Sequence, residues 1–203
     1  MADRIFVKTP VFRGSFVNLV TARANKGEDG EEGDPKFGLM IVLDRKDAKT
    51  KAFIDELNAA IIAACKDKFG KAPLLKNKLG KTIPNADQLK HFPIRKGEGV
   101  GDGDQFAGMW CIRASTRFKP PFIDKTGEKL DSEDELYSGA HYRVKISVWA
   151  WDSKKGGKGV SISLETGVKI KDDDKFGGGG KAEDDFADDI GGSDDEEDLD
   201  DLG

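Results

Sequence analysis

The chain has 203 residues, including two cysteines and two histidines, which is enough for one domain with an appendage, and we expect no second full domain in it. Residues 172–203 contain 15 acidic and 2 basic residues, a net charge of −13, whereas residues 1–171 contain 31 basic and 23 acidic residues, a net charge of +8. The overall net charge of −5 therefore hides a basic body and an acidic tail. This division predicts a body that binds a polyanion.

No segment of the sequence predicts membrane insertion or export. The longest apolar run, Ala59–Cys65, has seven residues, whereas a helix that crosses a bilayer needs about 20. Met1–Arg4 leads into a strand-like stretch and contains no apolar signal core. We therefore expect a cytoplasmic protein without membrane contact, in which Cys65 and Cys111 are buried free thiols.

The first half of the body is expected to form two strands and a helix. Ile5–Arg23 is rich in Val, Phe and Thr, which predicts a long bent strand with a bulge at Gly14. Alternating apolar residues over Phe37–Leu43 predict a second strand, which should pair with the first across an acidic loop. A stripe of apolar residues with helical spacing then predicts a helix over 47–69.

The second half is expected to add three strands. Residues 71–104 hold three of the seven prolines and show little periodicity, so we expect an irregular loop there. Strand character returns over Gln105–Lys119, and Tyr142–Asp152 and Val160–Lys171 then predict a hairpin. The expected fold class is therefore mainly β, with five strands and one long helix between strands 2 and 3.

Basic and aromatic side chains share one face of the predicted strands. In the strand from Tyr142, alternation separates the basic and aromatic residues from the apolar ones, and the strand through Trp110 likewise has a basic face. Cations attract phosphates and flat rings stack on bases of any sequence, so this combination favours single-stranded nucleic acid. The candidate binding residues are Arg13, Arg113, Arg117, Phe118, Lys119, Phe122, Arg143, Lys145, Trp149 and Trp151.

Other interpretations of these side chains stay open at this point. Aromatic residues of a small β-barrel are often core, and basic residues on a half-exposed strand are often only solvated. Phe12 and Phe16 on the first strand are expected in the core, and alternation does not decide whether Trp110 faces the core or the binding surface. The basic residues of 71–104 are either phosphate contacts or ordinary loop residues.

The sequence contains no motif that predicts catalysis, a metal or a cofactor. Gly97–Gly103 resembles a phosphate-binding loop only in its glycines, because no Lys-Ser/Thr pair follows and its acidic residues would repel phosphate. His91 and His141 do not have the spacing of metal ligands with Cys65 or Cys111. Neither a nucleophile motif nor a dinucleotide-binding fingerprint occurs. We therefore expect a binding protein that is not an enzyme.

The tail combines dense acidic clusters with isolated apolar residues. Its composition cannot bury enough apolar surface to offset chain ordering, so we expect residues 172–203 to be disordered. Intramolecular attraction would let the acidic residues compete for the basic surface, and short acidic-apolar segments also dock on partner proteins. The expected partner-binding residues are Phe186, Asp188, Asp189, Leu199 and Leu202.

Several segments resemble the single-stranded DNA-binding proteins of lytic tailed bacteriophages. The resemblance spans most of the chain and is carried by Met1–Phe6, Met40–Asp44, Phe53–Leu57, Tyr142–Ile146, the final strand through Val168, Phe176–Gly180 and Glu183–Asp189. It implies a five-stranded OB-fold barrel with one helix, sequence-nonspecific binding of ssDNA, and a tail that contacts phage replication or recombination proteins. Tails of this class commonly finish in an aromatic residue. This one ends in Leu202–Gly203, so Phe186 is the candidate substitute.

These expectations combine into one hypothesis. Residues 1–171 form an OB-fold ssDNA-binding domain, and residues 172–203 form a disordered acidic tail that competes with DNA and recruits partners. The protein coats and protects ssDNA during phage DNA replication and recombination in the host bacterial cytoplasm without a cofactor, and it binds duplex DNA weakly once the tail is removed. The alternatives are an RNA-binding or RNA-chaperone barrel and an adaptor that acts through its acidic tail. The sequence leaves a homodimer open.

Overall fold

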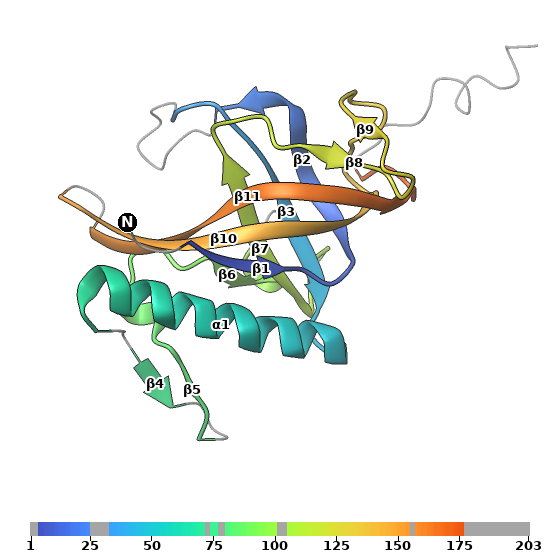
Figure 1. Cartoon of the computed structure of the whole chain (residues 1–203). Coiled ribbons are helices and arrows are strands. Elements are labelled where there is room, and N and C mark those ends of the chain that lie inside the picture. Colours follow the sequence, from blue (N-terminus) through green and yellow to red (C-terminus); the bar gives the residue numbers. More distant parts are fainter. Residues whose placement is uncertain are drawn as a thin grey trace, which may run out of the picture.

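The computed structural model describes residues 4–24, 33–71, 74–76, 80–100, 105–154 and 157–176. Figure 1 shows their elements, which in chain order are β1 (Ile5–Lys8), β2 (Phe12–Arg23), β3 (Lys36–Asp44), α1 (Ala48–Phe69), β4 (Leu74–Lys76), β5 (Thr82–Pro84), η1 (Ala86–Gln88), β6 (Ile94–Lys96), η2 (Gly97–Gly99), β7 (Met109–Thr116), β8 (Phe122–Ile123), β9 (Lys129–Leu130), β10 (His141–Ser153) and β11 (Gly157–Lys171). The five tail residues expected to bind partners lie outside the described ranges.

The fold is mainly β with one long helix, as the sequence predicts. Five long strands, β2, β3, β7, β10 and β11, correspond to the predicted ones, and α1 lies between the second and third of them in the chain. The predicted count is nevertheless incomplete, because six strands of two to four residues accompany them in the described ranges. Three of these, β4, β5 and β6, lie in the predicted irregular loop and are too short to show a periodic pattern.

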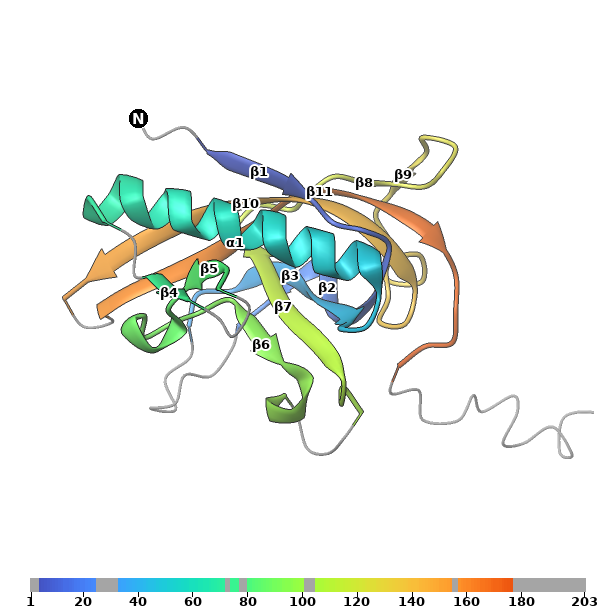
Figure 2. The same ribbon diagram turned by 90° about the horizontal axis from the view of Figure 1, so that it is seen from below.

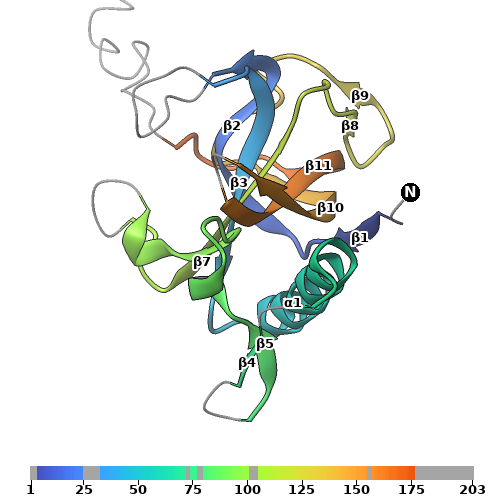
Figure 3. The same ribbon diagram turned by 90° about the vertical axis from the view of Figure 1, so that its left-hand side faces the viewer.

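The five long strands pair around a cycle. β2 pairs antiparallel with β3, which confirms the predicted pairing, and β3 pairs antiparallel with β7. β7 meets β11 in parallel through Ser115 and Ser163, and β11 pairs antiparallel with all of β10. β10 returns to β2, where Tyr142 lies opposite Phe12. Figure 3 shows β1 and β10 on one side of this arrangement and β7 on the other.

The predicted first strand is interrupted at Pro10, so the prediction of one strand over 5–23 is wrong. β1 pairs with β10, whereas β2 pairs with β3. Proline has no N–H to donate to a strand ladder. Thr9, just before it, instead bonds Val144 twice: its N–H donates to the Val144 carbonyl at 3.0 Å, and its hydroxyl accepts from the Val144 N–H at 3.0 Å.

The irregularity in β2 follows Gly14 rather than lying on it. The register with β3 shifts between Ser15 and Asn18, and Phe16 in this interval has a φ of 48°. A left-handed backbone is costly for a side chain as large as that of Phe. Gly14 is required for close approach, because a Cβ atom there would lie 2.7 Å from the ring of Tyr142.

The helix α1 confirms the predicted helix over 47–69 and is capped at both ends. Asp47 accepts a hydrogen bond from the Thr50 N–H at 2.9 Å, and Gly70, with a φ of 72°, ends the helix. Figure 2 shows α1 lying across the strands beside β1. The side of α1 that packs on β10 and β1 carries the buried residues Phe53, Leu57, Ala60, Ile61, Ala64 and Cys65.

The core settles three expectations from the sequence. Phe12 is buried, as predicted, and Cys65 and Cys111 are buried free thiols. Trp110, which alternation left undecided, is partly buried and packs against the main core rather than lying on the outer face of β7. No helix of the described chain combines the length and apolar character needed to cross a membrane.

The close approach of β2 to Tyr142 predicts the effect of a small substitution. Gly14→Ala places a methyl group against a fully buried ring, so we expect a loss of about 1–3 kcal/mol in the free energy of unfolding, measured by urea denaturation. Gly99→Ala is the matched control, because a Cβ atom at Gly99 meets nothing within 4 Å. Equal stabilities for the two variants would contradict this packing.

Candidate nucleic-acid interface

The outer surface of β2, β3, β7 and β6, which we call the β3 face, carries cations at its two sides, with apolar groups and the carboxylate of Asp44 between them. Two rows of opposed residues cross it, and each ends in a cation: the first is Arg13, Val42, Cys111 and Arg95, and the second is Ser15, Met40 and Arg113. Arg95 and Arg113 are exposed, whereas Met40 and Cys111 are buried. The face therefore offers phosphate-binding groups on either side of an apolar floor.

An exposed aromatic ring on this face contacts a buried one. Phe16 is 52% exposed, and its ring centroid lies 6.4 Å from that of the buried Phe106, with the planes tilted by 50°. Both residues line a concavity of about 490 Å³, together with Arg13, Val42 and Met109. A large side chain that is both exposed and held in a left-handed backbone conformation is typical of a binding surface rather than of a core.

The floor itself is a small apolar cluster that is separate from the main core. It consists of Met40, Phe106 and Cys111, with the partly buried neighbours Val42 on β3, Val100 after η2 and Met109 at the start of β7. Burial, assisted by the negative charge of Glu98, raises the pKa of the Cys111 thiol to about 11. The thiol therefore stays neutral at physiological pH and acts here as an apolar group.

The two arginines at the β7 side of the face lie close enough to influence each other. Partial desolvation, together with the charge of Arg95, lowers the pKa of Arg113 from its ordinary value. Like charges held near each other disfavour the charged form, so positive charge is concentrated at this corner of the face.

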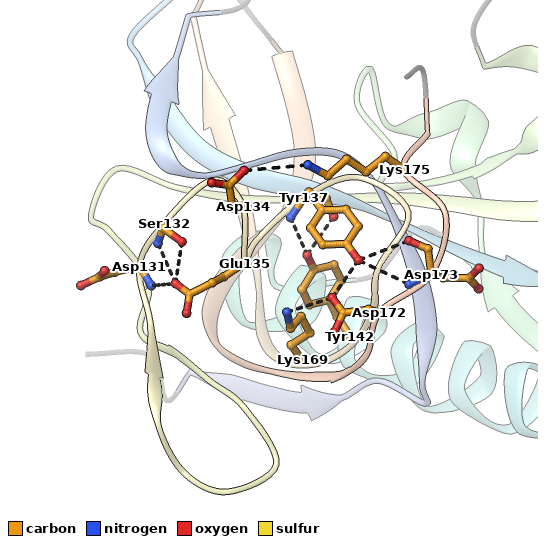
Figure 4. Close-up of polar contacts among 10 residues, drawn as sticks. All are labelled: Asp131, Ser132, Asp134, Glu135, Tyr137, Tyr142, Lys169, Asp172, Asp173 and Lys175. Atoms are coloured by element: carbon orange, nitrogen blue, oxygen red, sulfur yellow. Dashed lines mark hydrogen bonds and ion pairs between the residues drawn. The ribbon is translucent and has the colours of Figure 1, made fainter. Parts of the chain in front are cut away.

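Residues 172–176, which we call the strap, extend the described body beyond the boundary predicted at Lys171. Figure 4 shows their contacts: the Tyr137 hydroxyl donates to Asp172 at 2.7 Å, and Lys169 also bonds this carboxylate at 3.0 Å. These two bonds lower the pKa of Asp172. The segment from 172 to 176, predicted as disordered, is thus bound to the body because its first acidic residues find partners on it.

The strap also contacts Arg13, the arginine at the start of the first row of the β3 face. Asp173 lies 2.8 Å from His141 Nε2 and 3.6 Å from the Arg13 guanidinium. Arg13 also donates to the Asp174 carbonyl at 2.8 Å, and the Phe176 ring lies 4.1 Å from its guanidinium carbon. Arg13 is therefore occupied by carboxylate, carbonyl and aromatic groups of the strap.

The structure divides the predicted binding residues among several places. Arg13 and Arg113 lie on the β3 face. Past the end of β7, Arg117 pairs with Asp34 at 2.6 Å, Phe118 is 82% exposed, and Lys119 donates to the Asp131 carbonyl at 3.4 Å. Arg143, Lys145, Trp149 and Trp151 lie on the outer side of β10, whose first residues pair with β2 beside Arg13.

Phe122 is a correction to the predicted set. Its side chain is fully buried, and its ring meets that of Tyr142 edge-on with 6.0 Å between centroids. It also packs over Gly167, where a Cβ atom would lie 2.1 Å from it. The two prolines before Phe122 made a surface loop the natural expectation, but the side chain belongs to the core and is not available to a ligand.

Sequence reasoning missed the aromatic pair on the β3 face. Phe16 was expected in the core, and that prediction is wrong because the bulge after Ser15 moves later residues to the other face of the strand. No pattern in the sequence indicated that Phe106 would lie on this face. The sequence indicates Arg95 only as one basic residue of a loop. Its position opposite Cys111 depends on the short strand β6.

No group of three or more His, Cys, Asp or Glu side chains that could hold a metal ion occurs among the described residues. His91 instead contacts the Val160 carbonyl through Nδ1 at 3.0 Å, and its ring lies 6.2 Å from that of Trp151. His141 pairs with the strap. Both histidines therefore have contacts that hold segments of the chain together.

Comparison with known proteins identifies the family. The family model described as the ssDNA-binding protein of Enterobacter phage Enc34 matches residues 5–200. The chain belongs to this family of phage ssDNA-binding proteins. Protein p50 of Acyrthosiphon pisum secondary endosymbiont phage 1 is 30% identical over 145 residues, which cover 71% of this chain and 75% of that protein.

Solved structures of phage ssDNA-binding proteins share the fold of this family member. The bacteriophage Enc34 protein in complex with ssDNA matches with a TM-score of 0.61 and 24% identity, over 85% of this chain and 89% of that one. The gp2.5 protein of bacteriophage T7 matches with a TM-score of 0.52 and 15% identity, over 93% of this chain and 96% of that one. These likenesses support the mainly β architecture with one helix.

Proposed function

We propose that the protein coats and protects ssDNA during phage DNA replication and recombination in the host bacterial cytoplasm, without catalysis and without a cofactor. Membership of a phage ssDNA-binding family supports the ligand. We further propose that the cycle of long strands acts as an OB-type barrel, whose outer face over the second and third strands is the usual surface for oligonucleotides. In this chain those strands are β3 and β7.

The observation that carries the proposal is the exposed Phe16 ring on the β3 face, where it lines the same concavity as Arg13. Phosphates would contact Arg13 on one side and Arg95 with Arg113 on the other, while bases stack on Phe16 and cover the apolar floor. No side chain in this arrangement reads a particular base, so binding would not depend on sequence. Arg117, Phe118 and Lys119 lie beyond the end of β7 and would extend the path of the strand.

The strap supports a competing role for the acidic tail. Asp173 and the Phe176 ring already lie on Arg13, as a phosphate and a base would. The strap would thereby tether the acidic residues that follow it to the body beside the β3 face, so that their negative charge competes there at a raised local concentration. The same acidic-apolar residues, with Phe186 at their centre, would recruit replication and recombination proteins when DNA displaces the tail.

An RNA-binding barrel would use the same cations and rings. The family membership favours DNA, and competition between oligo-dT and oligo-U of equal length against the full chain separates the two ligands. Preference for the RNA oligomer would move the proposal to RNA.

Removing the exposed ring from the β3 face tests the proposed site. We expect Phe16→Ala to weaken binding of a labelled oligo-dT about 10-fold, since stacking on one aromatic ring contributes roughly 1–3 kcal/mol per base. Fluorescence anisotropy at several salt concentrations measures this change.

Leu74→Ala is the control for that experiment, because Leu74 is an exposed apolar residue on β4, outside the β3 face. It should leave the affinity unchanged. An unchanged affinity in Phe16→Ala as well would remove the β3 face as the binding site.

Removing the tail tests the competition. Residues 177–203 contain 12 acidic and 1 basic residue, a net charge of −11, so we expect a chain ending at Phe176 to bind oligo-dT about 10-fold more tightly at low salt and to bind duplex DNA weakly. A full-length variant with Asn and Gln in place of these acidic residues controls for tail length and should behave like the truncated chain. Identical affinities and salt dependence in wild type and truncation would refute competition by the tail.

A further inference from the structure

A second surface combines exposed rings with cations on the other side of the molecule. On the outer side of β1 and β10, Phe6 is 46% exposed and Trp149 is 48% exposed, and Lys8, Arg143 and Lys145 lie around them. We call this surface the β10 face. Figure 3 shows β1 and β10 on the side opposite β7.

The strand register brings these groups together on one face. Phe6 lies opposite Ser147 and Lys8 lies opposite Lys145, so their side chains point the same way from neighbouring strands. Lys145 Nζ lies 4.1 Å from the centroid of the Phe6 ring. Alternate residues of a strand are about 7 Å apart, so Arg143, Lys145 and Trp149 present successive groups along one line.

Within the described ranges, no carboxylate pairs with the cations of this face. Lys8, Arg143 and Lys145 form no ion pair with a carboxylate in the described part of the chain. The nearby carboxylate of Glu165 is compensated, because it accepts a hydrogen bond from Ser147 and lies 3.5 Å from Arg4. The face therefore has a net positive charge available to an external anion.

Trp149 and Trp151 have different roles on β10. The Trp151 indole N–H donates to the Ser161 hydroxyl at 2.9 Å, and its ring packs so closely over Gly159 that a Cβ atom there would lie 2.4 Å away. Trp151 therefore anchors β10 to β11. Trp149 lies two residues earlier with half of its surface exposed, which leaves its ring available for stacking.

The strap separates the β10 face from the β3 face. β10 meets β2 only at His141 and Tyr142. At this junction the Asp173 carboxylate lies on both His141, at 2.8 Å, and Arg13, at 3.6 Å. A carboxylate at this point would repel the phosphates of a strand that tried to cross from one face to the other.

We propose that the β10 face binds a second single strand of nucleic acid, so that one chain holds two strands on opposite sides and brings them together for annealing. Uncompensated cations beside half-exposed rings favour a polyanion with bases over an apolar protein partner. This inference rests on the proposed function, because the β3 face holds the first strand. In this proposal, a separate binding site is formed by Phe6, Lys145 and Trp149, which do not contribute to the site on the β3 face.

The test counts strands per full-length chain. Native mass spectrometry is performed with an oligo-dT of about eight nucleotides, a length within the site size of one OB fold. The wild type should bind two oligomers per chain. Lys145→Ala combined with Trp149→Ala should bind one, with the first dissociation constant changed less than about twofold, and should anneal complementary strands at least about fivefold more slowly.

The matched control combines Lys51→Ala on α1 with Leu74→Ala on β4, one lysine and one exposed apolar residue outside both faces. It should retain two oligomers per chain and the wild-type annealing rate. Binding of a single oligomer by the wild type would overturn the proposal.

Two further results would also overturn it. If the Lys145 and Trp149 variant weakens the first strand as much as Phe16→Ala does, the two faces form one site. If the variant retains both oligomers and only dissociates a protein dimer, the β10 face is an interface between copies of the chain. A failure of the proposed function is distinguishable, because the wild type would then bind no oligomer at all.

Discussion

The buried side chain of Tyr142 is the contact on which the rest of this structure depends. Its ring packs edge-on against the ring of Phe122, and its ring centroid lies 6.3 Å from that of Phe12. The ring also fills the space above Gly14, at the short junction where β10 returns to β2. Its hydroxyl donates to the Tyr137 carbonyl at 2.8 Å and accepts from the Tyr137 N–H at 2.9 Å. This pair of bonds fixes Tyr137, whose own hydroxyl holds the strap. Tyr142 thus lies where β10 completes the strand cycle and, through Tyr137, supports the start of the strap.

Where residues close together in the sequence determine an element, the sequence was sufficient to predict that element. Alternation over Phe37–Leu43 and the apolar stripe ending at Phe69 predicted β3 and α1, because each element packs one face against the main core. The break at Pro10 and the bulge after Ser15 could not be placed in the same way. Both depend on which distant strand supplies the hydrogen bonds, and the partner of Thr9 is Val144, 135 residues away.

The same limit on prediction from the sequence is more evident at the candidate site. Alternation correctly placed Arg113, Arg143 and Lys145 on outer faces. It could not show that β7 and β10 lie on different sides of the strand cycle. The predicted basic residues therefore lie on two surfaces, which meet where the Asp173 carboxylate contacts Arg13 and His141. Phe16 escaped prediction because a one-residue change of register reverses the side to which every later side chain points. The opposed charges of body and tail, by contrast, follow from composition alone.

The central claim is that ssDNA lies across the β3 face and contacts the ring of Phe16. Photocrosslinking of the full chain to an oligonucleotide containing 5-bromodeoxyuridine, with mapping of the modified peptides, tests it most directly. At substoichiometric DNA we predict crosslinks on β2 around Phe16 and on neighbouring residues of β7. Crosslinks confined to the β4–β5 hairpin or to the outer side of β10, with none on β2, would contradict the account.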